Sequence, residues 1–200
     1  WEQVKPLLYP MIRPDSIVHS LSGRTPAEIA SDNQDSDKDP DEGRSQMLVH
    51  NPWLADLVIC YAIDSPMTLR MVAESDLQRW QIDSLQLHQT AMDNIKDGKL
   101  PEFAGMPGPD GDLILGGFGD GGISTKSSYL LYPELYELIR AEFRGHIWAA
   151  IPSRDALIIF SSEHTQRETL LNLVANDYAN SDHALSDRLF EITADGIVLA

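Results

Sequence analysis

The chain has 200 residues, 42% of them hydrophobic, with four Trp, five Phe and six Tyr, so it can bury a core and is too apolar to be wholly disordered. Its 31 acidic residues against 15 Lys and Arg give a net charge of -16, and no basic run interrupts it. Such a chain is repelled by phosphate backbones, which disfavours nucleic acid and anionic membranes as direct partners. No apolar run approaches the roughly 20 residues of a membrane helix, and the first six residues lack the pattern of a signal peptide.

The first half of the chain predicts short strands and two helices on either side of an acidic segment. Residues 31–45 hold no large apolar side chain, and their like charges repel, which predicts a mobile, solvated loop. An interaction tail is the alternative for this segment. Capping-box spacings predict the two helix starts. The predicted elements are strands at 7–12, 54–63 and 68–73, and helices that begin near Ser75, with Gln78, and near Asp83, with Gln86.

The second half alternates strand-like runs with two helical patterns. Pro133 suits a first helical position and Gly145 a helix end, while Thr165 with Glu168 has the spacing of a further capping box. The predicted strands are 113–115, 146–151, 156–160, 189–193 and 197–199, the last two as a hairpin. Because the strands come in clusters, the pattern predicts an α+β fold. We expect a mixed or antiparallel sheet with helices packed against it, in a single compact domain over residues 1–200.

The single cysteine, Cys60, cannot form an intrachain disulfide and sits in an apolar run, so it predicts a buried, inert thiol rather than a reactive nucleophile. The absence of a disulfide framework indicates a cytoplasmic protein. His88 falls on the apolar stripe of its helix, which favours a hydrogen-bonded core histidine over a ligand. The histidines show no zinc spacing, so no metal site is predicted.

The glycine-rich run 117–122 satisfies G-x-G-x-x-G formally, but a dinucleotide site needs an acid at the end of the next strand, about 20 residues later, and the next predicted strand ends much later, near Asp155. The run therefore predicts a tight turn, or a nest of backbone amides that binds an anion with help from Ser124. No cofactor is predicted.

Four stretches, taken in order, resemble the YtpQ family of bacterial proteins. They are residues 8–13, then 61–64 with Arg70, then 91–95, and finally 119–121 with 151–155. The resemblance implies an intracellular bacterial α+β protein with no accepted activity, cofactor or catalytic residue. After Asp120 and Gly121 the family places an aromatic residue, an acid and Ala-Ser, whereas this chain continues with Gly122 and Ile123, and the acidic 31–45 segment is peculiar to it.

Polar residues at predicted strand ends form the candidate site, since loops on a rigid scaffold commonly carry function. Arg154 beside Asp155 has the chemistry of a clamp for a carboxylate or phosphate, and ion pairs that hold corners together are the alternative. The candidate residues are Arg13, Asp64, Asp120, Gly121, Ser124, Arg154 and Asp155.

The sequence favours a non-catalytic binding or adaptor protein with a protein partner or a small anionic ligand. The alternative is a hydrolase or transferase in which Asp120 or Asp155 is the general base and Arg154 holds an anionic substrate. Whether the chain is an enzyme, and its oligomeric state, stay open at this point.

Overall fold

The computed structural model describes residues 1–21, 47–65, 68–97, 103–107, 113–117, 126–143 and 145–200. The contacts divide these into two compact units, Trp1–Asn94 and Ile95–Ala200. Each unit combines antiparallel strands with helices, so the predicted α+β fold is confirmed. A single domain over the whole chain stays a prediction, and the predicted loop at 31–45 lies outside the described residues.

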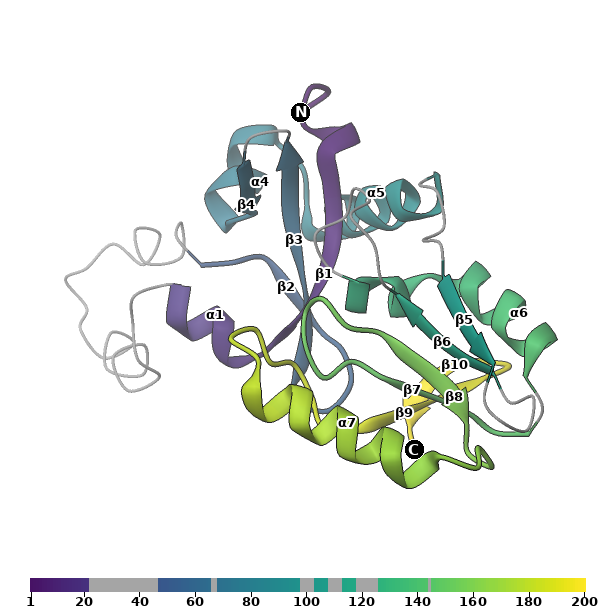
Figure 1. Ribbon diagram of the computed structural model, residues 1–200. Helices are drawn as coiled ribbons and strands as arrows, with labels where there is room; N and C mark the ends of the chain where they lie inside the picture. The colour runs from purple at the N-terminus through teal and green to yellow at the C-terminus, as the bar shows by residue number, and fades with distance from the viewer. Residues whose placement is uncertain (22–46, 66–67, 98–102, 108–112, 118–125, 144) are drawn as a thin grey trace. The chain divides into compact units, whose positions relative to one another are not determined.

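The first unit is built on one long strand. The strand β3 pairs with β1 along one edge and with β2 and β4, one after the other, along the opposite edge, always antiparallel (Figure 1). The strands are β1 (Leu8–Pro14), β2 (His50–Pro52), β3 (Leu57–Ser65) and β4 (Thr68–Met71), and the helices are η1 (Lys5–Leu7, 3-10), α1 (Ser16–Leu21), α4 (Glu74–Trp80) and α5 (Ser84–Asp97). Both strands predicted as a pair are present, as β3 and β4.

Side chains on β3 alternate between the two faces of this sheet. Val58 and Cys60 are buried against Val18 of α1 on one face. Tyr61 points to the other face, where its hydroxyl contacts His88 of α5 at 2.8 Å. The amide of Asn94 fixes the far end of α5 by donating to the carbonyl oxygen of Leu8, at 2.8 Å. Helices therefore cover both faces of β3.

The predicted helix starts in this unit have different outcomes. Asp83 caps α5 as expected, because its Oδ1 accepts a 2.7 Å hydrogen bond from the amide of Gln86. The prediction that Ser75 caps α4 is wrong: the cap residue is Ala73. Asp76, three residues after it, accepts the amide hydrogen of Ala73 at 3.0 Å and so supplies the side-chain half of the cap.

The second unit holds a sheet in the order β10-β9-β7-β8-β6-β5, all antiparallel. The strands are β5 (Phe103–Pro107), β6 (Leu113–Gly117), β7 (Ile147–Ala150), β8 (Ile158–Ser161), β9 (Leu189–Thr193) and β10 (Gly196–Leu199), and the helices are η2 (Lys126–Leu131, 3-10), α6 (Pro133–Glu142) and α7 (Arg167–Asn180). The predicted hairpin is present as β9 and β10.

Helix α7 packs on one face of this sheet. Leu170 and Val174 contact Ala150, Ile158 and Phe160, all buried. Figure 1 shows α6 on the opposite side of the sheet from α7. Pro133 begins α6 as predicted. The prediction of Thr165 as the cap of α7 is wrong, because the cap residue is Gln166, which makes no side-chain capping bond.

Among the described helices, none combines the length and the apolarity that crossing a membrane would require.

Candidate anion-binding site

The predicted site residues belong to different parts of the chain. Asp120, Gly121 and Ser124 lie outside the described residues. Arg13 and Asp64 belong to the first unit, and Arg154 with Asp155 belongs to the second. A site shared by these two pairs stays a prediction.

Arg13 and Asp64 lie at opposite ends of the paired strands β1 and β3. Arg13 is opposite Val58, and Asp64 is six residues further along β3, about 20 Å away at the rise of a strand. Arg13 is buried, and its guanidinium donates to the carbonyl oxygen of Ile12 at 2.9 Å. One small ligand cannot contact both residues.

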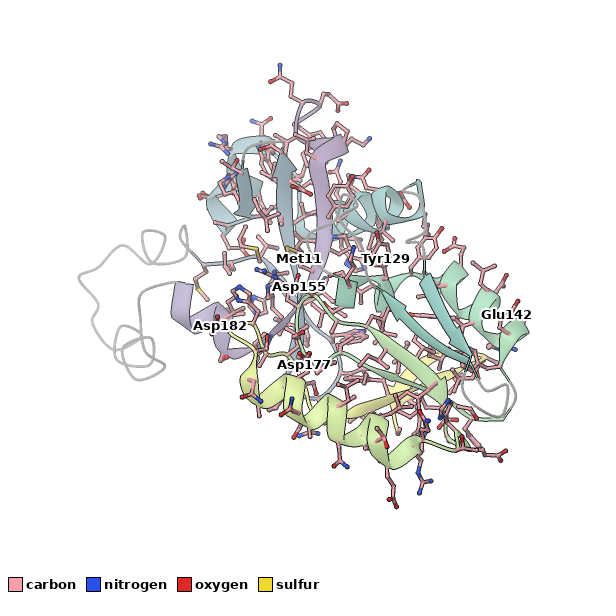
Figure 2. The ribbon with its side chains drawn as sticks, viewed as in Figure 1. Met11, Tyr129, Glu142, Asp155, Asp177 and Asp182 are labelled. Atoms are coloured by element: carbon pink, nitrogen blue, oxygen red, sulfur yellow. The ribbon has the colours of Figure 1, made fainter. Side chains whose placement is uncertain are left out.

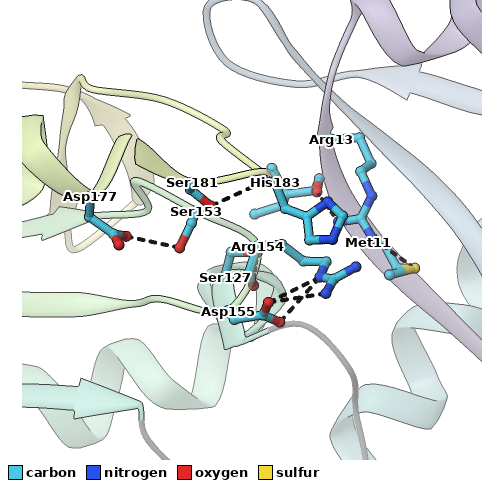
Figure 3. Close-up of polar contacts among 10 residues, drawn as sticks. Met11, Arg13, Ser127, Ser153, Arg154, Asp155, Asp177, Ser181 and His183 are labelled. Atoms are coloured by element: carbon cyan, nitrogen blue, oxygen red, sulfur yellow. Dashed lines mark hydrogen bonds and ion pairs between the residues drawn. The ribbon is translucent and has the colours of Figure 1, made fainter. Parts of the chain in front are cut away.

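Arg154 lies in a corner between β7 and β8 that is fixed by its backbone (Figure 3). Its amide donates to the carbonyl oxygen of His183 at 3.0 Å. Its carbonyl oxygen accepts from the amide and the hydroxyl of Ser127, at 3.2 and 3.1 Å. The buried Ser153 donates to Asp177 of α7 at 2.9 Å, and Figure 2 labels Asp155 and Asp177 in this part of the unit. The predicted corner is therefore rigid.

The charges of this corner cancel. The Nε and Nη2 atoms of Arg154 donate to the carboxylate of Asp155 at 3.1–3.2 Å. Arg154 and Asp155 thus each have a partner of opposite charge. This is the arrangement expected in the alternative interpretation, in which ion pairs hold the corner together. An anionic ligand at Arg154 would meet a guanidinium whose charge Asp155 already offsets.

A second cluster, which sequence reasoning missed, joins Arg70 of β4 to Asp76 and Arg79 of α4. Arg70 donates from Nη1 and Nη2 to the two oxygens of Asp76, at 2.6 and 3.1 Å. Arg79 donates from Nη2 to the same carboxylate at 2.5 Å. The side chain of Asp76 is 5% exposed, whereas those of Arg70 and Arg79 are 49% and 66% exposed. One buried acid thus orients two solvent-facing guanidiniums, and we call these three residues the arginine pair cluster.

Burial and the two neighbouring cations act on the pKa of Asp76 in opposite directions. Burial alone would raise the pKa of Asp76, but the hydrogen bonds from Arg70 and from the amide of Ala73, with the charges of Arg70 and Arg79, hold that pKa below its usual range. Asp76 is therefore ionised at neutral pH. Two positive charges against one negative charge leave the cluster at +1, in a chain whose net charge is -16.

Aromatic rings lie beside this cluster. The guanidinium carbon of Arg79 is 5.8 Å from the ring centre of Trp80, a cation–π distance. Trp1 and Trp80 are 5.6 Å apart between ring centres, with their planes tilted by 42°. These contacts restrict the rotamers of Arg79, so less conformational entropy is lost when its guanidinium binds an anion.

A hollow of about 440 Å³ at the start of α7 is a weaker candidate. It is lined by residues 162–169, in which the acids Glu163 and Glu168 outnumber the one arginine, Arg167. His164 is buried there, with Nδ1 accepting from the amide of Gln166 at 3.0 Å and Nε2 without a hydrogen-bond partner. Since solvent does not reach Nε2, a ligand in the hollow would not reach it either.

Two further predictions concern cysteine and metals. Cys60 is fully buried, and burial raises the pKa of its thiol to about 11 although the charge of Arg13 opposes the shift. The predicted burial of the thiol is confirmed, and its raised pKa agrees with the prediction that the thiol is inert. Within the described ranges, no three His, Cys, Asp or Glu residues are grouped so that they could hold a metal ion.

No protein-family model, no curated protein and no solved structure matches this chain. The resemblance to the YtpQ family stays a prediction.

Proposed function

We propose that the protein is a non-catalytic binding protein that takes a small anionic ligand at the arginine pair cluster. The observation that supports this most is the way in which the buried carboxylate of Asp76 holds two exposed guanidiniums, so that a local charge of +1 stands out in a strongly acidic chain. Membership of the YtpQ family and a cytoplasmic location belong to the same proposal and rest on the sequence.

The donors that the cluster leaves to solvent suit an oxyanion. A guanidinium has five N–H donors; Asp76 uses one nitrogen of Arg79 and two of Arg70, and Nη1 of Arg70 also donates to the carbonyl oxygen of Met71 at 3.4 Å. The remaining N–H groups belong to side chains that are half exposed or more. Arginine recognises carboxylate and phosphate oxygens through such paired donors. Because the site is open to solvent, we expect affinities on the order of millimolar for inorganic phosphate.

The Arg154 corner supports the same function less well. Its guanidinium and the carboxylate of Asp155 neutralise each other, so an anionic ligand gains less electrostatic stabilisation there. The two guanidiniums and the one carboxylate of the arginine pair cluster sum to +1 before any ligand arrives. The enzyme alternative with Asp120 or Asp155 as general base stays a prediction.

Isothermal titration calorimetry with inorganic phosphate and pyrophosphate tests the proposal. We expect Arg79→Gln and Arg70→Ala each to weaken binding about fivefold or more, since each removes a charge-assisted hydrogen bond. Arg140→Ala, an exposed arginine on α6, is the matched control and should bind as the native chain does. Loss of binding in Arg154→Ala, with Arg79→Gln unaffected, would move the site to the predicted corner and refute the proposal.

The non-catalytic part of the proposal has its own readout. Pyrophosphate incubated with the protein should give an unchanged ³¹P NMR spectrum after a day. Conversion of pyrophosphate to phosphate would favour the hydrolase alternative instead, provided that Arg140→Ala retains this activity and Asp155→Asn abolishes it.

A further inference from the structure

Two tryptophans beside the arginine pair cluster are held in place by their backbones. The carbonyl oxygen of Trp1 accepts hydrogen bonds from the amides of Val4 and Lys5, each at 2.9 Å. Trp80 is the last residue of α4, and Gln81 ends that helix in the left-handed conformation, with φ at 56°. Both tryptophans are partly exposed, and their ring centres are 5.6 Å apart. The first unit therefore presents aromatic surface at a fixed place.

This aromatic surface lies next to the free donors of Arg79. The guanidinium carbon of Arg79 is 5.8 Å from the ring centre of Trp80, and its side chain is 66% exposed. Asp76 accepts from Nη2 of this guanidinium, which leaves Nε and Nη1 for a ligand. Cationic donors and an aromatic ring thus lie close enough together for one small molecule to contact both.

We propose that the ligand of the arginine pair cluster is a phosphate ester of a flat aromatic group. The phosphate accepts from Arg70 and Arg79, and the ester ring lies against Trp80 and Trp1. Aromatic rings attract each other at centre distances of about 4.5–7 Å, in tilted as well as offset-stacked arrangements. A phosphate ester carries nearly two negative charges at neutral pH, so it gains more from two guanidiniums than a carboxylate does. This inference rests on the proposed function, since the ring is held only beside a bound anion.

A second pair of arginine and tryptophan, in the other unit, serves as an internal control. Arg167 lies 6.0 Å from the ring centre of Trp148, a similar cation–π distance. The acids Glu163 and Glu168 line the same hollow as Arg167, so negative charge exceeds positive charge there. An arginine on a tryptophan is therefore not enough for the proposed site, which also needs the excess of positive charge at the arginine pair cluster.

The test is an NMR titration of the ¹⁵N-labelled full chain with phenyl phosphate and with cyclohexyl phosphate, which has a similar size and charge but no aromatic ring. The indole N–H signals report on the four tryptophans. Phenyl phosphate should shift the signals of Trp1 and Trp80 through its ring current, and should bind about threefold or more tighter than cyclohexyl phosphate. The signals of Trp53 and Trp148 should stay in place. Equal affinity of the two esters, or shifts confined to Trp53 or Trp148, would overturn the proposal.

Two variants separate the aromatic contact from a merely apolar one. Trp80→Leu keeps an apolar side chain but removes the ring, so it should bind the two esters with more nearly equal affinity. Trp80→Phe keeps a ring and should retain the preference for phenyl phosphate. An undiminished preference in Trp80→Leu would refute the aromatic contact. If Trp80→Leu does not fold, the titration of the native chain still decides between the two outcomes.

Inorganic phosphate distinguishes a failure of this inference from a failure of the proposed function. If phosphate binds at the arginine pair cluster and the two esters bind equally well, the anion site stands and the aromatic preference is wrong. If neither phosphate nor either ester binds at millimolar concentration, both proposals are wrong.

Discussion

Replacing Asp76 by alanine removes a carboxylate that does two things at once. It accepts the amide hydrogen of Ala73 at the start of α4, a cap worth about 1 kcal/mol. It also pairs with Arg70 and Arg79, whose side chains are 49% and 66% exposed. Because solvent screens such pairs, each adds about 0.5 kcal/mol rather than the value of a buried pair. We therefore expect Asp76→Ala to lower the free energy of unfolding by about 2 kcal/mol.

Urea denaturation followed by tryptophan fluorescence measures this change. With a typical dependence of 1–3 kcal/mol per molar urea, the midpoint should fall by about 1 M. Asp76→Asn keeps an acceptor for the Ala73 amide and loses the charge, so it should cost about half as much. The exposed Asp155 offers a control, since Asp155→Ala removes a surface ion pair without a helix cap. A loss below about 0.5 kcal/mol in Asp76→Ala would refute the reasoning.

The pH dependence of this effect follows from the lowered pKa of Asp76. Above its ordinary value of 3.8 the carboxylate is ionised in both the folded and the unfolded chain, and its contribution is complete. As the pH falls below that value, Asp76 is protonated first in the unfolded chain. Its contribution to stability is then lost as the pH passes the lower pKa that Asp76 has in the folded chain. The stability difference between the native chain and Asp76→Asn should thus be constant near neutrality and shrink below about pH 4.

Three further predictions concern other groups. Tyr61→Phe should cost about 1 kcal/mol in urea unfolding, because its two hydrogen-bonding neighbours lose a partner, and unchanged stability would contradict these hydrogen bonds. Cys60, with a pKa of about 11, should not react with a chromogenic thiol reagent at pH 8 until the chain unfolds, and rapid labelling of the folded protein would show that the thiol is accessible. The hydrogen bond and charge of Glu191 raise the pKa of His146, so Glu191→Gln should lower the pKa of His146 in an NMR titration, whereas an unchanged value would mean that the pair does not form in solution.

Much of the fold was predictable because local chemistry and tertiary packing agree. Asp83 caps α5 and Pro133 begins α6, as their positions in the sequence indicate. The strands β2 and β5 were missed, since each is short and is defined by its partner rather than by an apolar pattern. Thr165 has the right spacing for a cap, yet α7 begins two residues later.

The candidate site was harder to predict because it depends on strand pairing. Asp76 and Arg79, three residues apart, could have been recognised as a helical ion pair. Arg70 could not, because it reaches Asp76 through the pairing of β4 with β3, where it lies opposite Ile63. By contrast, the pair of Arg154 and Asp155 can be recognised directly in the sequence, because the two residues are adjacent. The same adjacency lets their charges neutralise each other.

A crystal structure of the protein grown with pyrophosphate tests the central claim most directly. The account predicts an anion within hydrogen-bonding distance of both Arg70 and Arg79, with Asp76 still bound between them. An anion bound at Arg154 instead, or an empty arginine pair cluster at millimolar pyrophosphate, would contradict it.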